Sequence, residues 1–305
     1  MTCTEAEFVA TDSTALFHRT WIPTEGTALR GVLAIVHGLG EHGGRYGAIA
    51  EAANAAGFAV VACDHRGHGR SGGLRGHVDS FDNYVADLVG FLGDAVPGLG
   101  DDLPVFLLGH SMGGLIAVLT LQSDHGLPLR GAVLSNPCLG VAVQAPKIKV
   151  AMAKALAKLL PRLRLDNELV TEDLCRDQAV IDAYVADPHV HRKISTRWYA
   201  ALLEAMAGAN ANPDAIQLPT LWLLSGKDAM CDATVATDFA GQLPSPAVSM
   251  QRFPEAYHEA HNGPDKGEFV AALLGWLDVH VQLGTSPAAG DSAPGPTSDR
   301  APQPA

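Results

Sequence analysis

The sequence predicts an α/β protein whose mostly parallel, eight-stranded sheet is flanked by helices. Short apolar, β-branched runs alternate with longer helical patterns, and Gly and Pro residues mark the joins between them. Apolar residues make up 47% of the 305 residues, as in a globular chain. The expected strands span residues 8–11, 16–21, 32–36, 59–63, 105–108, 132–135, 221–224 and 248–253. The expected helices span residues 45–56, 81–96, 112–122, 233–242 and 266–281.

The alternation stops after the sixth expected strand. Residues 138–208 read as helix throughout, with no strand, and therefore predict a helical cap inserted into a core formed by residues 1–137 and 209–282. From residue 283 to residue 305 the chain is rich in Pro, Ala, Gly and Ser. Such a segment buries too little apolar surface to offset the entropy of ordering, so we expect a disordered tail.

Charge and composition exclude several classes of protein. A net charge of −12 argues against binding to nucleic acid, whose phosphates attract cationic surfaces. No apolar run approaches the roughly 20 residues of a bilayer span, and no basic stretch followed by an apolar one opens the chain. We therefore expect a soluble, cytoplasmic protein. The cysteines are odd in number and scattered, so we expect free thiols at Cys3, Cys63, Cys138, Cys175 and Cys231.

A candidate nucleophile lies in the segment that starts at Val105. There an apolar strand pattern runs into Gly109-His-Ser-Met-Gly113, a G-x-S-x-G motif, and a helical pattern follows it. In this context the motif predicts a sharp turn that exposes the hydroxyl of Ser111 above the sheet, with the positive end of the helix toward the reaction centre. An ordinary glycine turn is the alternative.

A serine hydroxyl needs a base and a carboxylate to become a nucleophile, and on this type of turn they follow in the order acid, then histidine. Asp228 ends a buried-type strand in a Gly-Lys-Asp turn, and His258 lies on the loop before the last helix. Asp232, four residues later at a helix start, and His261, three residues after His258, remain alternatives for the two roles. The sequence thus predicts catalytic Ser111, Asp228 and His258.

The third requirement is a pair of backbone N–H groups for the oxyanion of the tetrahedral intermediate. The expected strand 32–36 runs into His37-Gly-Leu-Gly-Glu-His42, at the place where a fold with this strand–serine–helix turn supplies the first donor. We expect Leu39 and Met112 to donate.

Histidines are dense between residues 37 and 77, which raises the question of a metal site. They lie in Gly-His and His-Gly turns without regular metal-ligand spacing, a setting in which histidine usually makes loop hydrogen bonds. We expect no metal and no cofactor. The residues are His37, His42, His65, His68 and His77.

The chain resembles the monoacylglycerol lipase branch of the α/β-hydrolases, which includes lysophospholipase-like proteins and is also filed under serine aminopeptidases. The resemblance extends from about residue 8 to residue 282. It implies the α/β-hydrolase fold, the triad Ser111, Asp228 and His258, and oxyanion donors Leu39 and Met112. It is carried by residues 37–42 (HGLGEH) with Arg45-Tyr46, 64–73 (DHRGHGRSGG) with Arg75-Gly-His77, 109–114 (GHSMGG), 225–228 (SGKD) and 257–259 (YHE).

From these features we expect a cofactor-free serine hydrolase that cleaves lipid esters, with monoacylglycerols as first choice. The alternatives are a lysophospholipase or a broad esterase, then an aminopeptidase or a non-catalytic ligand-binding relative. Residues 147–164 combine basic with apolar residues and could touch a membrane peripherally; the alternative is a cap helix packed over the core. Cys231, close to Asp228, is expected to be either a buried inert thiol or a reactive one.

Overall fold

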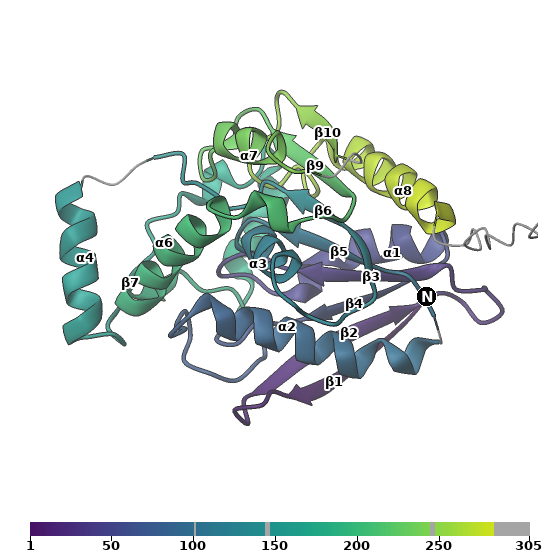
Figure 1. Cartoon of the computed structure of the whole chain (residues 1–305), viewed down its shortest axis with the longest axis horizontal. Helices are drawn as coiled ribbons and strands as arrows, with labels where there is room; N and C mark the ends of the chain where they lie inside the picture. Colours follow the sequence, from purple (N-terminus) through teal and green to yellow (C-terminus); the bar gives the residue numbers. More distant parts are fainter. Residues whose placement is uncertain (101, 144–146, 245–247, 284–305) are drawn as a thin grey trace, which may run out of the picture.

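The computed structural model describes residues 1–100, 102–143, 147–244 and 248–283. The tail expected from residue 283 onward lies, beyond Leu283, outside the described residues. One eight-stranded sheet forms the centre of the molecule (Figure 1). In sheet order its strands are β1 (Thr2–Val9), β2 (Ala15–Ile22), β4 (Phe58–Cys63), β3 (Gly31–Val36), β5 (Val105–His110), β6 (Leu129–Ser135), β9 (Thr220–Ser225) and β10 (Val248–Phe253).

Strand directions bring the functional loops together. β1 pairs with β2 and β2 with β4 in antiparallel fashion, whereas the six strands from β4 to β10 run parallel. The carboxyl ends of these parallel strands meet at one edge, which is where such sheets place their ligands. The predicted eight-stranded, mostly parallel sheet is confirmed.

The parallel strands β4, β3, β5, β6 and β9 are buried on both faces because helices cover both sides, whereas β10 at the edge of the sheet is largely exposed. In β3, Val32, Ala34 and Val36 face one core, and Leu33 and Ile35 face the other. Helices α2 (Phe81–Ala95), α3 (Met112–Leu121) and α7 (Ala233–Ala240) pack into the first core. Helices α1 (Gly47–Ala55) and α8 (Lys266–Leu283) pack into the second. Short 3-10 helices span Gly43–Tyr46, Pro97–Leu99, Thr171–Asp173 and Pro213–Ala215.

The first strand differs from its prediction. We expected it at residues 8–11, but β1 spans Thr2–Val9 and the chain turns after Ala10. Its side chains are mostly exposed, so no buried face produces an apolar period. The strand exists because it pairs along its whole length with β2, from Thr2 opposite Ile22 to Val9 opposite Ala15. Local sequence does not show such pairing.

The segment between β6 and β9 forms a layer beside the sheet edge (Figure 1). It contains α4 (Lys147–Leu159), α5 (Gln178–Ala186) and α6 (Thr196–Asn210), and α4 lies on the far side of α6 from the sheet. The expectation of helix throughout was wrong. Strands β7 (Arg164–Asp166) and β8 (Lys193–Ser195) form a two-stranded antiparallel ribbon. Each has only three residues, too few to establish a period of two.

Within the described part of the chain, no helix combines the length and the apolar character needed to cross a bilayer. The domain boundaries at 137/138 and 208/209 stay a prediction.

Candidate active site

Ser111 stands between β5 and α3 in a strained backbone conformation. Its φ of 54° and ψ of −119° place a non-glycine residue in a region that side chains rarely adopt. The turn is held from both sides, because the N–H of Ser111 donates to the carbonyl of Ser135 at 3.0 Å and its carbonyl accepts from Cys138 at 2.9 Å. The neighbouring strand β6 and the chain after it therefore fix the direction of the serine.

The glycines of the motif are required by space. A Cβ on Gly109 would lie 2.6 Å from the carbonyl oxygen of Gly113 and 2.9 Å from the Cβ of Ala117. A Cβ on Gly113 would lie 1.9 Å from the carbonyl oxygen of Val36. Real Cβ atoms do not approach backbone so closely, so α3 can start this near β5 and β3 only with glycine at both positions.

Asp228 and His258 meet although they lie 30 residues apart. His258 Nδ1 is 2.8 Å from Asp228 Oδ2. The other oxygen, Asp228 Oδ1, accepts from the backbone N–H of Met230 at 2.8 Å and of Cys231 at 3.0 Å. The carboxylate is thereby fixed just after the end of β9. It orients the imidazole of His258 through Nδ1, so that Nε2 remains available to accept a proton.

The pair shifts both pKa values in the direction that keeps it charged. Burial alone would raise the pKa of Asp228, but the charge and hydrogen bond of His258 and the two backbone N–H groups lower it below its ordinary value. Burial alone would lower the pKa of His258, but the charge and hydrogen bond of Asp228 outweigh it and raise that pKa above 6.5. An imidazolium formed during a reaction is thus stabilised.

The two alternative residues have other contacts. Asp232 caps helix α7, where its side chain accepts from the N–H groups of Thr234 and Val235. The ring of His261 stacks on Tyr46, with centroids 5.2 Å apart. Its two nitrogens have no hydrogen-bond partner among the described residues. The structure brings His258, not His261, to Asp228.

Leu39 and Met112, the expected oxyanion donors, line the same pocket as Ser111. Met112 is the first residue of α3, so its N–H has no partner within the helix. The loop that carries Leu39 is held by a side chain, because the N–H of Gly38 donates to Glu41 Oε1 at 2.6 Å. The hydroxyl of Tyr46 donates to the same oxygen at 2.8 Å.

A buried ion cluster, which the sequence reasoning missed, supports this loop. Arg45 donates to Glu259 through both terminal nitrogens at 2.7 Å, and to Glu41 Oε2. Although burial raises their pKa values, Arg45 lowers the pKa of Glu41 and of Glu259 to about 2. The spacing of Glu41 and Arg45, one helical turn apart, was the signal that could have indicated the first pair. Glu259 joins from 214 residues away.

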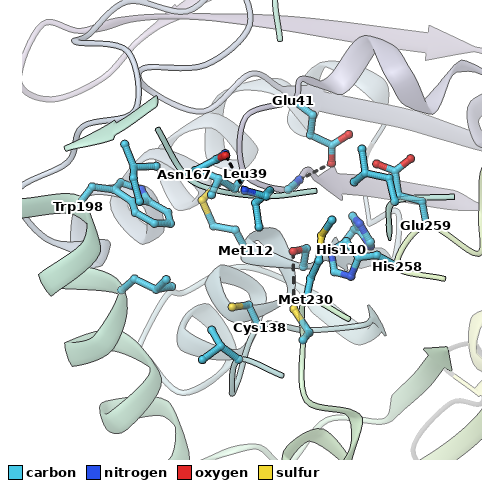
Figure 2. Close-up of a pocket in the computed structure, with 18 of the residues that line it drawn as sticks. Leu39, Glu41, His110, Met112, Cys138, Asn167, Trp198, Met230, His258 and Glu259 are labelled. Atoms are coloured by element: carbon cyan, nitrogen blue, oxygen red, sulfur yellow. Dashed lines mark hydrogen bonds between the residues drawn. The ribbon is translucent and has the colours of Figure 1, made fainter. Parts of the chain in front are cut away.

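One pocket connects these groups (Figure 2). His110, His258 and Glu259 lie toward one end, and Asn167 and Trp198 lie toward the other. The lining is mainly apolar and comes from the core loops and from the segment between β6 and β9. It includes Leu39, Met112, Val141, Leu169, Leu174, Ile194, Trp198, Leu202 and Met230.

Cys231 lies beside the serine, with its Sγ 3.9 Å from Ser111 Oγ. A hydrogen bond to Cys138 and burial raise the pKa of Cys231 well above its ordinary value, so the thiol stays protonated. One ligand atom each of Asp228, Cys231 and His258 lies within 4.8 Å of the others, a spacing that a metal ion could use. Because the oxygens of Asp228 already accept hydrogen bonds from His258 and two backbone N–H groups, we assign them to orienting the imidazole.

The histidines of residues 37–77 make loop hydrogen bonds. His37 Nε2 accepts from the N–H of His65 at 2.9 Å, so its Nδ1 donates to the carbonyl of Gly38 at 2.8 Å. His65 Nε2 donates to the carbonyl of His37 at 3.1 Å. His42 Nε2 donates to Asp187 Oδ2 at 2.8 Å. These hydrogen bonds connect the loop of residues 37–42, which we call the oxyanion loop, with the loop after β4 and with the segment after α5.

Comparison with known proteins places the chain among serine hydrolases. Residues 27–265 match the family model described as serine aminopeptidase, S33. The chain belongs to this family. The hydrolase is 33% identical to the monoacylglycerol lipase of Mycolicibacterium smegmatis over 284 residues, which cover 92% of this chain and 99% of the relative. It is 32% identical to phospholipase YtpA of Bacillus subtilis over 251 residues, which cover 82% and 96%.

A solved structure agrees with these matches. The crystal structure of Paleococcus ferrophilus monoacylglycerol lipase superposes with a TM-score of 0.76 at 32% identity, covering 92% of this chain and 100% of that one. The hydrolase therefore has the α/β-hydrolase fold and is a carboxylic ester hydrolase of the monoacylglycerol lipase-like branch.

Proposed function

We propose that the hydrolase cleaves monoacylglycerols to fatty acid and glycerol through an acyl-enzyme on Ser111. His258 takes the proton of the hydroxyl as Ser111 Oγ attacks the ester carbonyl, and then gives it to the leaving glycerol oxygen. Water, deprotonated by the same ring, releases the fatty acid. Asp228 holds the ring and stabilises the imidazolium.

The bond between His258 Nδ1 and Asp228 Oδ2, at 2.8 Å in the wall of the pocket that Ser111 lines, carries this proposal. Cys231 links the two halves of the site. Its Sγ lies 3.9 Å from Ser111 Oγ and within 4.8 Å of a ring nitrogen of His258. Ser111 and His258 both line the active-site pocket next to Cys231, and the proposal requires Ser111 Oγ to turn from Cys231 toward His258 Nε2 for the proton transfer.

The backbone N–H groups of Leu39 and Met112 would receive the oxyanion. Both residues line the pocket beside Ser111. The carboxylate of Glu41 holds Gly38 and so fixes the direction of the next peptide in advance. Such preorganised donors commonly contribute about 10²–10³ in kcat each.

An acyl chain fits the character of the pocket. Nine of its twenty lining residues are Leu, Met, Val, Ile or Trp, which favour a hydrocarbon over a peptide. The carboxylates of Glu41 and Glu259 also line it, but both already accept hydrogen bonds from Arg45. The apolar remainder of the lining disfavours the aminopeptidase alternative. The Bacillus subtilis relative is named a phospholipase, which supports lysophospholipids as the second candidate class of substrate.

Peripheral contact with a membrane through residues 147–164 is part of the proposal. Helix α4 and the turn after it expose apolar side chains, namely Ile148 (71%), Met152 (65%), Leu159 (78%) and Leu160 (53%). Lys154, Lys158 and Arg162 accompany them. Met152→Ser with Leu159→Ser should weaken sedimentation with anionic vesicles while leaving hydrolysis of a soluble ester unchanged. Equal sedimentation of the native protein and this variant would contradict the contact.

Ser111→Ala tests the chemistry. We expect it to lower monoacylglycerol hydrolysis by at least about 10⁴-fold and to abolish labelling by a fluorophosphonate, with an unchanged circular dichroism spectrum. A panel of monoacylglycerols, lysophospholipids and p-nitrophenyl esters ranks the substrates. A native protein that the probe does not label would instead be a non-catalytic relative.

A further inference from the structure

A second hollow adjoins the loop that carries Leu39. We name it the cationic cleft; it is lined by Arg75, Arg164, His191, Arg192 and Lys193, with Asp166, Asp187, Thr171, Tyr184, Val185 and Val190. It is close to the active site in two ways. The N–H of His191 donates to the carbonyl of Gly40 at 2.9 Å, and Tyr184 lines both this cleft and the active-site pocket.

The ribbon of β7 and β8 separates the two hollows. Successive residues of a strand face opposite sides, and in β8 Ile194 lines the active-site pocket whereas Lys193 lines the cleft. Asp166 stands opposite Lys193 in the ribbon, and Arg164 lies two residues before it on the same face. The ribbon thus turns the apolar Ile194 toward the pocket on one face, and Arg164, Asp166 and Lys193 toward the cleft on the other.

The positive charges of the cleft outnumber its acids. The side chain of Asp187 accepts a hydrogen bond at 2.8 Å from His42, which does not line the cleft. Asp166 lies 3.5 Å from Arg192. Within the described part of the chain, Arg75, Arg164 and Lys193 form no ion pair with a carboxylate. This concentration of cations is unexpected on a chain whose net charge is −12.

Arg75 is the best-placed of these cations. Its Nη2 donates to the carbonyl of Gly69, whereas its buried Nη1 has no hydrogen-bond partner among the described residues. Burial and the charges of Arg75 and Arg164 lower the pKa of His191, so both guanidinium groups lie near enough to interact electrostatically with this ring. Guanidinium forks and an ammonium group are the donors that proteins use for phosphate oxygens.

We propose that the cationic cleft binds a phosphate group, carried by the headgroup of a lysophospholipid or present as free phosphate. The lipid source rests on the proposed ester hydrolysis. The acyl chain would lie in the apolar pocket, and the headgroup would pass Tyr184, which borders both hollows. The cleft would then allow the enzyme to accept phosphate-bearing monoacyl lipids in addition to uncharged monoacylglycerols.

The variant R164E/K193E reverses two charges of the cleft at exposed positions, and R130E/K266E makes the same charge change on exposed residues outside it. We compare kcat/KM for 1-lauroylglycerol with that for 1-lauroylglycerol 3-phosphate. The ratio of kcat/KM for 1-lauroylglycerol 3-phosphate to that for 1-lauroylglycerol should fall at least tenfold in R164E/K193E and stay at the native value in R130E/K266E. R164Q/K193Q removes the two charges without reversing them and should perturb folding less. It should lower the kcat/KM ratio by an intermediate amount.

Calorimetric titration with inorganic phosphate gives a readout that does not need activity. Phosphate should bind the native protein and R130E/K266E but not R164E/K193E. Phosphate binding that R164E/K193E loses, with the same kcat/KM ratio in this variant as in the native protein, would identify free phosphate as the ligand. Binding to a native protein that hydrolyses no ester would support the cleft and count against the proposed function alone. Equal phosphate binding by native protein and R164E/K193E, with equal lipid preference, overturns the proposal.

Discussion

The backbone of Gly113 lies directly against that of Val36, so closely that a Cβ on Gly113 would be 1.9 Å from the Val36 carbonyl oxygen. Gly113→Ala should therefore push α3 away from β3 and lower the free energy of unfolding by about 3 kcal/mol or more, the upper range for overpacking. Urea unfolding measures this. Gly275→Ala, on α8 with nothing within 4 Å, is the control and should be neutral or stabilising. Equal stability of both variants would contradict the argument.

Asp228→Asn should lower kcat by about 10⁴-fold, because the amide no longer holds the imidazole in the required tautomer. Asp232→Asn should retain activity, since Asn caps a helix as well as Asp does. Steady-state hydrolysis of a p-nitrophenyl ester compares the two. The reverse result would transfer the acidic role to Asp232.

His258 predicts the pH profile. Burial lowers the pKa of His258, but the charge and hydrogen bond of Asp228 outweigh burial and raise it above 6.5. The base must be neutral to accept a proton. The acid limb of kcat/KM should therefore lie above pH 6.5, with activity lost as pH falls through it. His261→Phe should leave this limb in place. A limb near pH 4, where burial places the pKa of His261, would point to that ring instead.

Stability should decrease on acidification. Burial lowers the pKa of His37 and of His261 to about 4, whereas the unfolded chain takes up these protons near pH 6.5. The unfolded state therefore binds more protons between pH 6.5 and 4, and the free energy of unfolding falls as pH is lowered through that range. The raised pKa of His258 acts in the opposite direction but is a single group. Urea unfolding at pH 7.5, 5.5 and 4.5 should give decreasing midpoints, with a smaller decrease in His261→Phe.

Arg45→Ala should cost about 3–5 kcal/mol of unfolding free energy, because it leaves Glu41 and Glu259 buried without their cation. Lys227→Ala removes the exposed pair with Glu255 and should cost less than about 1 kcal/mol. Thermal and urea unfolding compare them. We also expect Arg45→Ala to lower kcat, since Glu41 holds the loop of Leu39. A cost below that of Lys227→Ala would mean that the cluster contributes little.

The sheet and the turn at Ser111 were predictable because their causes are local. An apolar run such as that of β9 predicts a strand buried on both faces. Glycines at 109 and 113 predict a turn that has no room for a Cβ at either position. β1 was misplaced, and the ribbon of β7 and β8 was missed, because each depends on a pairing partner. Neither has a buried face that would leave a period in the sequence.

The sequence by itself determined the positions of most strands of the central sheet along the chain, and the presence of a serine, two candidate acids and two candidate bases near strand ends. Only the tertiary structure decided that His258 rather than His261 meets Asp228, and that Glu259 joins Arg45 and Glu41 beneath the oxyanion loop. The reason is distance: backbone sterics and burial act between near neighbours in the chain, whereas a hydrogen bond needs its two atoms within about 3 Å. Residues far apart in sequence reach that separation only when the sheet brings its strand ends together.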